Sequence, residues 1–245
     1  MKELMDFIAN LQLPEAGRPW LQTPPESSAE IVGDSAAVAG ESLVSFVSGL
    51  SQQAREDVLN STLLMQLAAS KMYDKATQRE EWFKFYTEGL ARLGWTLSHQ
   101  EMHLYHPSQQ SFTVDGVALE MIGGATGGSA FSSVAQRTFE ALRKEPHALR
   151  LFLDNSNSGN VGTFQIMPCA QSVTGEVTML LNCMQVVRNV TAREFLFMTF
   201  GKNDLRIYRS TQTSVLNVQT YAQVRQAVIA KLGQHAQRFV AHLKI

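Results

Sequence analysis

The chain has only two cysteines among its 245 residues, Cys169 and Cys183. Secreted domains that depend on disulfide bonds usually carry more, so this low number favours a reducing compartment. The first residues include the acids Glu3 and Asp6, where a secretory signal would have lysines followed by an apolar run. We therefore expect a soluble, cytoplasmic protein, and export by a route that needs no signal peptide stays open.

The sequence also lacks an excess of charge and a long apolar run. The formal net charge is −1, and non-specific binding of nucleic acid needs a positive surface, so we expect no nucleic-acid partner. A membrane-spanning helix needs about eighteen consecutive apolar residues, and the sequence has no such run. A membrane is therefore not the expected partner, although contact with a membrane surface stays an open alternative.

Motifs for phosphate or calcium binding are incomplete. Residues 123–129 have the glycine spacing of a phosphate-binding loop, but Ser129 stands where that loop needs lysine and Ala130 where it needs a hydroxyl. This stretch therefore predicts a connection between two helices. Residues 154–159 imitate the start of a calcium loop, but Gln165 replaces its bidentate carboxylate. Asn, Ser and Gly are common in turns, so we expect a solvent-exposed turn there.

His99, Glu101 and His103 form the most favourable pattern for a metal site. On a β-strand these three side chains would share one face, and two imidazoles with a carboxylate make a known ligand set. No partner residues that would orient the ligands can be identified, so the pattern favours the solvated face of an edge strand. Metal binding by this trio stays open, but we expect no metal and no cofactor.

Nucleophilic catalysis has no recognisable motif either. The sequence contains no G-x-S-x-G nucleophile elbow. Cys169 and Cys183 lie in apolar strand-like segments, where cysteines are usually inert small apolar side chains. Their closeness across a predicted hairpin permits a disulfide without requiring one. We therefore expect no catalytic residue.

Apolar periodicity and capping residues predict six helices. Small residues dominate 34–50, which predicts a buried packing helix capped by Asp34 or Ser35. The other helices are predicted from Ser51 onward, from a Thr77–Glu80 capping box to Gly94, at 116–122, at 129–144, and from Asn217 almost to the C-terminus. The helix that carries Trp82 should make the largest contribution to the core.

Period-two stretches predict the strands, which are expected at 95–105, 111–115, 148–153, 163–170, 176–187, 194–200 and 204–215. Residues 179–181 and 195–198 are apolar on both faces, which places them centrally in a sheet that is covered on both sides. The prediction is an α+β fold with a largely antiparallel sheet of about five to six strands. Helices should lie on both faces, with a helical section at the N-terminus and a long C-terminal helix. Residues 34–245 have no internal repeat, which favours one domain.

Residues 1–33 form a separate arm. More than half of the seven prolines fall here, and proline favours extended backbone. The same stretch contains Leu13, Trp20 and Leu21, and a disordered tail rarely contains a tryptophan. We therefore predict that the arm lies against a protein surface and that Leu13, Trp20 and Leu21 bind the partner.

These observations favour a non-enzymatic, structural protein that works by protein binding and self-assembly. The expected partner is another copy of the chain, which would make a homo-oligomer held by the arm. One alternative is a membrane-active, pore-forming toxin, whose pore-lining element would be the predicted helix at 35–50 or the hydroxyl-rich strand at 210–215. A second alternative is an enzyme with a dispersed site, for instance one that uses His99, Glu101 and His103.

Overall fold

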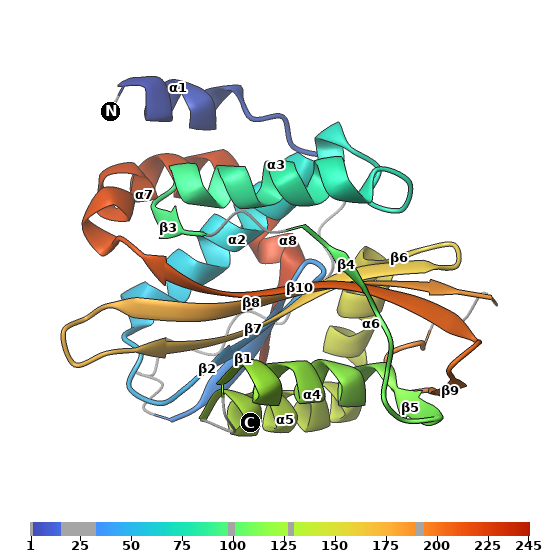
Figure 1. Ribbon diagram of the computed structural model, residues 1–245. Coiled ribbons are helices and arrows are strands. Elements are labelled where there is room, and N and C mark those ends of the chain that lie inside the picture. Colours follow the sequence, from blue (N-terminus) through green and yellow to red (C-terminus); the bar gives the residue numbers. More distant parts are fainter. Residues whose placement is uncertain (1, 16–32, 98–100, 127–129, 190–193) are drawn as a thin grey trace.

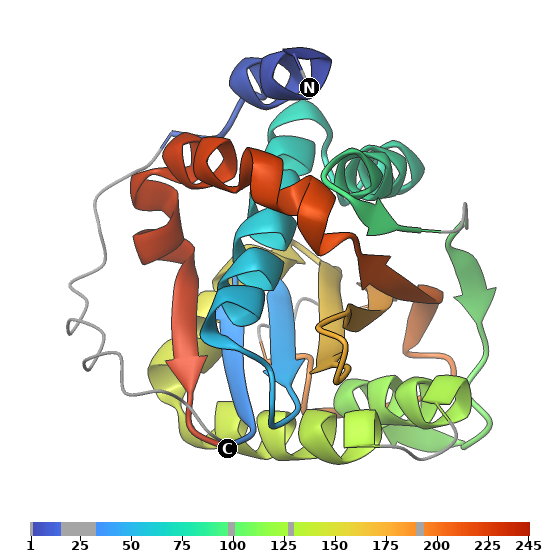
Figure 2. The ribbon, with the colours of Figure 1, turned by 90° about the vertical axis from the view of Figure 1, so that its left-hand side faces the viewer.

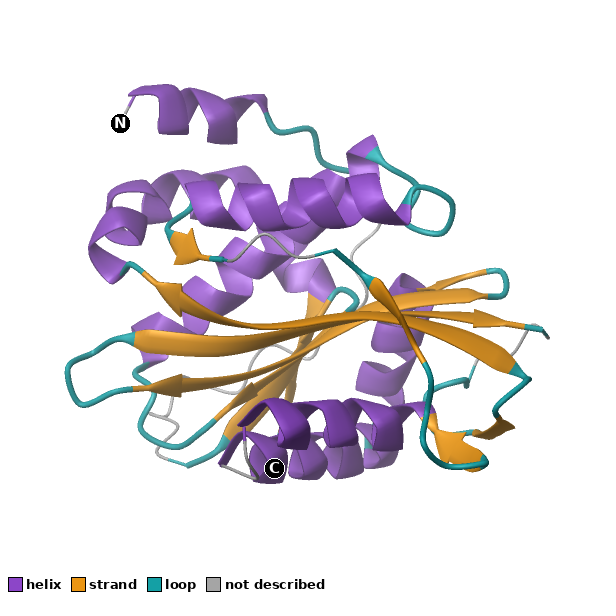
Figure 3. Cartoon of the chain, in the orientation of Figure 1, coloured by secondary structure: helices purple, strands orange, loops and turns teal. Residues whose placement is uncertain are grey.

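A central sheet lies between two layers of helices in the computed structural model, which describes residues 2–15, 33–97, 101–126, 130–189 and 194–245 (Figures 1 and 3). The upper layer contains α1 (Lys2–Asn10), α2 (Gln52–Met72), α3 (Arg79–Arg92), α7 (Val218–Leu232) and α8 (Gln234–Phe239). The lower layer contains α4 (Val114–Thr126), α5 (Ala130–Lys144) and α6 (Pro146–Ser156). The predicted α+β class, with helices on both faces of a sheet, is confirmed.

The sheet is mixed and mostly antiparallel, and within the described residues it has nine strands in the order β11-β1-β2-β7-β8-β10-β3, with β4 paired to β10 and β6 to β7. Only the β2–β7 pair among these is parallel. The strands are β1 (Ser35–Ala39), β2 (Ser42–Phe46), β3 (Trp95–Thr96), β4 (His103–Tyr105), β6 (Asn157–Ser158), β7 (Val161–Gln171), β8 (Val177–Arg188), β10 (Leu205–Leu216) and β11 (Val240–Leu243). A separate pair joins β5 (Ser111–Thr113) to β9 (Thr199–Gly201).

The sheet contributes side chains to two hydrophobic cores. Met179, Leu181 and Cys183 of β8 belong to the upper core, and Leu180 and Met184 belong to the lower core. Successive side chains of a strand point to opposite faces, so a strand at the centre of three layers is apolar on both. The predicted central position of residues 179–181 is confirmed.

Side-chain caps place the starts of two helices. The side chain of Ser51 accepts a hydrogen bond from the backbone N–H of Ala54 at 3.2 Å, and α2 starts at the next residue. Asn217 caps α7 in the same way through Thr220 N–H at 2.9 Å. The predicted Thr77–Glu80 capping box is wrong, because α3 starts after residue 78 without a side-chain cap.

The predicted helix at 34–50 is wrong, and this segment forms the β1–β2 hairpin instead. Every residue of both strands is buried. A Cβ atom on Gly40 would lie 2.4 Å from the Gln66 side-chain oxygen, so the hairpin passes close beneath α2. Gly40 has φ +61°, a turn conformation that glycine adopts without strain. The small residues therefore allow close approach of a buried hairpin to a helix, and they do not form a helix-packing face.

Two further strand predictions are wrong. Residues 148–153 lie in α6, whose first turn carries a proline and whose buried Ala148, Leu151 and Phe152 follow helical spacing. Phe195 and Leu196 are buried in the lower core but lie in turns, and only residues 199 and 200 of the predicted strand at 194–200 belong to β9. Leu196 C=O accepts a hydrogen bond from Asp115 N–H at 3.1 Å, which fixes this segment beside the start of α4 rather than in the central sheet.

The long C-terminal helix ends earlier than predicted. Helix α7 stops at Leu232, and Gly233 with φ +48° turns the chain into the short α8. Residues 240–243 then pair with β1 as the outermost strand of the sheet. The position of β11 depends on its pairing with β1, about 200 residues earlier in the chain, so no local pattern in the sequence predicts it. In the other direction, α4 continues through Gly123 and Gly124 to Thr126, although the helix was predicted to stop before these glycines.

Candidate functional site: the docking face of the N-terminal arm

The described part of the N-terminal arm packs against its own chain (Figures 1 and 2). Ile8 is 1% exposed and Leu11 is 7% exposed, and both belong to the upper core. The guanidinium of Arg92 lies 4.7 Å from the centre of the Phe7 ring, a favourable cation–π contact. Three further arm residues pack on the same core and are partly buried: Leu4, Met5 and Leu13. Helix α1 therefore places its apolar face on the body as an amphipathic helix does in a groove.

Two hydrogen bonds fix the position of the arm along α7 and α8. The Lys231 ammonium donates to the backbone C=O of Ala9 at 2.7 Å. The Nε2 atom of His235 lies 2.8 Å from the backbone C=O of Pro14. Lys231 and His235 both contact backbone carbonyls of the arm, so these two contacts position the arm and do not depend on the identity of its side chains there. Together with the buried Ile8, they make the arm-docking face, which we define as the surface of α3, α7 and α8 that contacts residues 2–15.

The structure describes one of the three predicted partner-binding residues. Leu13 is partly buried against the upper core. Trp20 and Leu21 lie outside the described residues, so their role stays a prediction. Nothing in the local sequence around Arg92, Lys231 and His235 marks these three residues as arm contacts.

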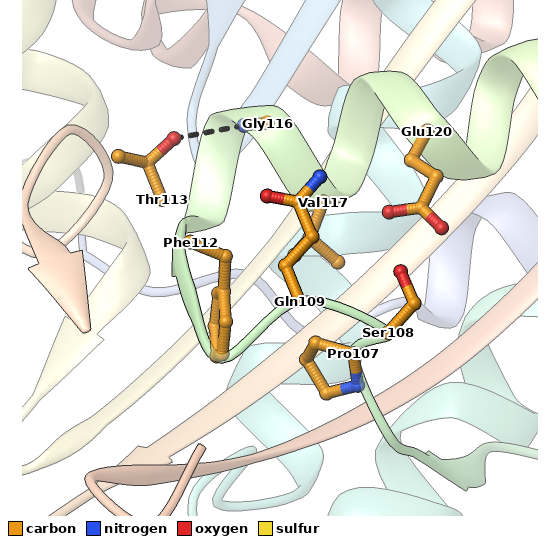
Figure 4. Close-up of a pocket in the computed structure, with 8 residues that line it drawn as sticks. All are labelled: Pro107, Ser108, Gln109, Phe112, Thr113, Gly116, Val117 and Glu120. Carbon is orange, nitrogen blue, oxygen red and sulfur yellow. Dashed lines mark hydrogen bonds between the residues drawn. The ribbon is translucent and has the colours of Figure 1, made fainter. Parts of the chain in front are cut away.

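A second feature is a shallow hollow of about 260 Å³ between the β4–β5 connection and α4 (Figure 4). Thr113 accepts a hydrogen bond from Gly116 N–H at 3.3 Å, and the exposed Glu120 accepts one from Tyr105 OH at 3.3 Å. Partial burial, together with the nearby Glu120 carboxylate, raises the pKa of Tyr105. The residues that line the hollow are Pro107, Ser108, Gln109, Phe112, Thr113, Gly116, Val117 and Glu120. This lining contains no histidine or cysteine, so it supplies no nucleophile–base pair of the usual kinds.

A buried polar network connects the β1–β2 turn to α2 and β7. Glu41 N–H donates to Gln66 Oε1 at 3.0 Å, and Gln66 Nε2 donates to Gln165 Oε1 at 3.0 Å. The Glu41 carboxylate is paired with the Lys75 ammonium. Burial raises the pKa of Glu41, and the charge of Lys75 opposes that rise. Two of its atoms, Glu41 Oε1 and Gln165 Nε2, are buried without a hydrogen-bond partner among the described residues. Because the other groups are enclosed and bonded to one another, we assign the network to holding the hairpin under α2.

The predicted metal trio is not assembled by the described residues. His99 lies outside them, and Glu101 and His103 are exposed. His103 lies on β4 opposite Arg209 of β10, a cationic neighbour. In the part of the chain that the structure describes, no group of three or more His, Cys, Asp or Glu side chains could hold a metal ion.

The calcium-like loop surrounds a protein cation. Asn157 Oδ1 and Gly159 C=O accept hydrogen bonds from Nη2 of Arg188 at 2.9 and 3.1 Å. Gly159 has φ +59°, as expected in the predicted turn. Asp154 belongs to α6, where it pairs with Arg150 at 3.6 Å. Two other oxygens of this loop, Asn157 Oδ1 and Gly159 C=O, therefore bind a guanidinium.

The two cysteines are free thiols that stand opposite different residues of the hairpin. Cys169 is opposite Met179, and Cys183 is opposite Gln165. Burial raises the pKa of both thiols, which disfavours the reactive thiolate. The two cysteines are not opposite each other in this register and both thiols are free, so no disulfide joins them.

The elements that a pore was expected to use are parts of the sheet. Residues 35–46 form the buried β1–β2 hairpin, so the proposed pore-lining helix does not exist. The hydroxyl-rich residues 210–215 lie in β10, which pairs with β8 along its whole length. No helix among the described residues combines the length and the apolar character needed to cross a bilayer.

Comparisons with known proteins give likenesses to solved structures alone. Neither a protein-family model nor a curated protein matches the chain. The structure of the Evf virulence factor is 11% identical, with a TM-score of 0.41, and the match covers 96% of this chain and 89% of that chain. A delta-endotoxin is 14% identical, with a TM-score of 0.39, over 82% of this chain and 90% of that one. The activated Cyt2Ba monomer from Bacillus thuringiensis subsp. israelensis is 19% identical, with a TM-score of 0.30, over 51% and 70%. At these TM-scores the likenesses assign no function.

Proposed function

We propose that this protein is a non-enzymatic, self-assembling protein whose copies exchange their N-terminal arms to form a homo-oligomer. One observation carries the proposal: Ile8 and Leu11 of the arm are buried in the core of a body to which residues 16–32 connect them. A second copy presents the same docking face. Exchange therefore replaces each contact within a chain by an identical contact between chains.

The connection is long enough for exchange. Residues 16–32 span up to ~55 Å when extended, at ~3.3 Å per residue. A folded chain of this length has a radius of gyration of ~18 Å. An arm can therefore leave its own docking face and reach the same face on an adjacent molecule.

The composition of the connection lowers the entropic cost of ordering it between two copies. Pro19, Pro24 and Pro25 restrict the backbone before any partner is bound. Trp20 and Leu21 supply apolar side chains of the type that anchors interfaces. We propose that both bind where the connection passes from one copy to the next, with Leu13 at the edge of the docking face.

Cross-linking across the Lys231–Ala9 contact tests this function. One variant carries Ala9→Cys and another carries Lys231→Cys, and the two are refolded together from denaturant and then oxidised. The native thiols are buried, so they compete little with the new pair. Exchange brings the two engineered cysteines together between chains, and we expect a covalent dimer on a non-reducing gel. Glu3→Cys, six residues before position 9 on α1, replaces Ala9→Cys as the control and should give much less dimer.

Light scattering on the same samples measures the particle. We expect deletion of residues 1–33 to leave a folded domain in a smaller particle, and Trp20→Ala to weaken assembly in the same direction. A full-length chain that is monomeric at all concentrations, with no dimer formed in the mixture, would rule out assembly by arm exchange. Leakage of dye from liposomes caused by such a monomer would favour the membrane-active alternative instead.

A further inference from the structure

His235 occupies an unusual position between two backbone carbonyls. Its Nδ1 atom lies 2.8 Å from Leu232 C=O, and its Nε2 atom lies 2.8 Å from Pro14 C=O. The first carbonyl belongs to the last turn of α7, and the second belongs to the arm. The imidazole is partly buried and its ring is stacked on Phe239, with centroids 6.4 Å apart.

The two carbonyls can accept hydrogen bonds but cannot donate them. A neutral imidazole has one N–H donor and one lone pair, so it can satisfy only one of two carbonyls. Its other nitrogen then faces a carbonyl oxygen, lone pair against lone pair. A protonated imidazole donates from both nitrogens and satisfies both carbonyls, and charged donors make the stronger hydrogen bonds.

We infer that His235 is a proton-dependent clasp, which holds the arm on the body when its imidazole is charged and loosens it when neutral. The carbonyl of Leu232 lies at the C-terminal end of α7, where the helix dipole also favours a cation. When the ring is neutral, the bond to Leu232 joins residues only three positions apart in the chain and can be kept, so the contact to Pro14 is the one that weakens. The part of this inference that makes His235 a regulator of arm exchange rests on the proposed function.

The charged groups around the clasp have both signs. Helix α7 contributes Lys231, which itself bonds the arm, and α8 contributes Arg238, and both oppose a second positive charge. The arm contributes Glu15, next to Pro14, which favours it. Helix α2 also contacts α8. The charged residues of α2 are Arg55, Glu56, Asp57 and Lys71. The β1–β2 turn also reaches α8, where Gly40 N–H donates to Phe239 C=O, and the next residue, Glu41, is paired with Lys75.

Hydrogen exchange of the arm tests the clasp in the full-length chain. Exchange of peptides that cover residues 2–15 is measured at about pH 5.5 and about pH 8, the range in which imidazoles change charge, and is corrected for the chemical exchange rate. We expect protection of these amides to be about tenfold greater at the lower pH, the worth of one charged hydrogen bond. Peptides from β8 report global opening and should show no matching change.

Two variants identify the group that responds. Gln at position 235 is neutral at both pH values, so His235→Gln should remove the pH dependence and leave the weaker protection. His106→Gln changes an exposed histidine of the β4–β5 connection and should leave the pH dependence intact. Protection that is equal at both pH values, or that varies with pH equally in His235→Gln, would overturn the clasp.

The outcome for the proposed function is read separately. Cross-linking between Ala9→Cys and Lys231→Cys chains reports exchange, whereas protection of residues 2–15 reports docking in either arrangement. Dependence of protection on pH in a strictly monomeric particle would support the clasp and contradict assembly. A cross-linked oligomer with the same protection at both pH values would support assembly by arm exchange and contradict the clasp.

Discussion

Glu41 and Arg188 are charged residues that lie almost fully buried in the fold. Glu41 is 3% exposed and paired with Lys75. Arg188 is 1% exposed, and its guanidinium lies 4.6 Å from the centre of the Phe195 ring. Burial lowers the pKa of Arg188, and two of its nitrogens, Nε and Nη1, have no hydrogen-bond partner among the described residues. Burial thus disfavours the charged form of both side chains, and only Glu41 has an opposite charge beside it.

Glu41→Gln tests whether desolvation or the ion pair dominates. Burial raises the pKa of Glu41, so the folded state holds a proton there more readily than the unfolded chain does. This contribution to stability is complete below the unfolded-state pKa and is lost as the pH rises through the folded-state pKa. Glutamine keeps an acceptor for Lys75 and cannot ionise. We expect the urea midpoint of Glu41→Gln to equal or exceed that of the wild type at about pH 7, with the difference closing toward about pH 4.

The exposed Glu56 of α2 provides the control for this measurement. Glu56→Gln should follow the wild-type pH dependence closely. A strong loss of stability in Glu41→Gln at neutral pH would show that the ion pair with Lys75 outweighs the desolvation of the carboxylate.

Among the elements, α3 joins the largest side chains to the core. Trp82 is 1% exposed, stacks on Tyr86 with centroids 5.2 Å apart, and donates from its indole N–H to Ser70 at 3.0 Å. Removal of such a side chain leaves a cavity in the upper core. We expect Trp82→Ala to lower the free energy of unfolding by about 3–5 kcal/mol, measured by urea denaturation.

Lys84 lies on the opposite, exposed side of the same helix and is 3.9 Å from Glu88. Lys84→Ala should change the free energy of unfolding by less than about 0.5 kcal/mol. If the two substitutions had similar effects, the burial of α3 would not be what stabilises the upper layer.

On the scale of the whole molecule, one sheet serves both cores, and Figure 2 shows helices on either side of it. Each layer of helices covers a face of the same strands, so neither layer has a complete core without the sheet. We expect the body to unfold in one cooperative transition. Trp82 and Trp95 report the upper layer, and in a Trp20→Phe background their fluorescence should follow the same urea curve as far-ultraviolet circular dichroism. A fluorescence transition at lower urea than the loss of helix would show that the layers unfold separately.

Elements whose signals are local can be predicted from the amino-acid sequence alone. Ser51 and Asn217 start α2 and α7 because each side chain caps the backbone N–H group three residues later. Strands β7, β8 and β10 were predicted within a few residues, because alternation and apolar runs on a strand need no distant information. The α+β class and the layered arrangement followed from these elements.

The tertiary structure decided the rest, and the candidate site is part of it. Alanine by itself favours helix over strand, so residues 35–46 form a hairpin because their packing with α2, β7 and β11 overrides that local preference. The arm-docking face has the same origin. Lys231 and His235 bind backbone carbonyls of residues more than 200 positions away, and backbone carbonyls are present in every residue, so no pattern of side chains in the sequence records these contacts.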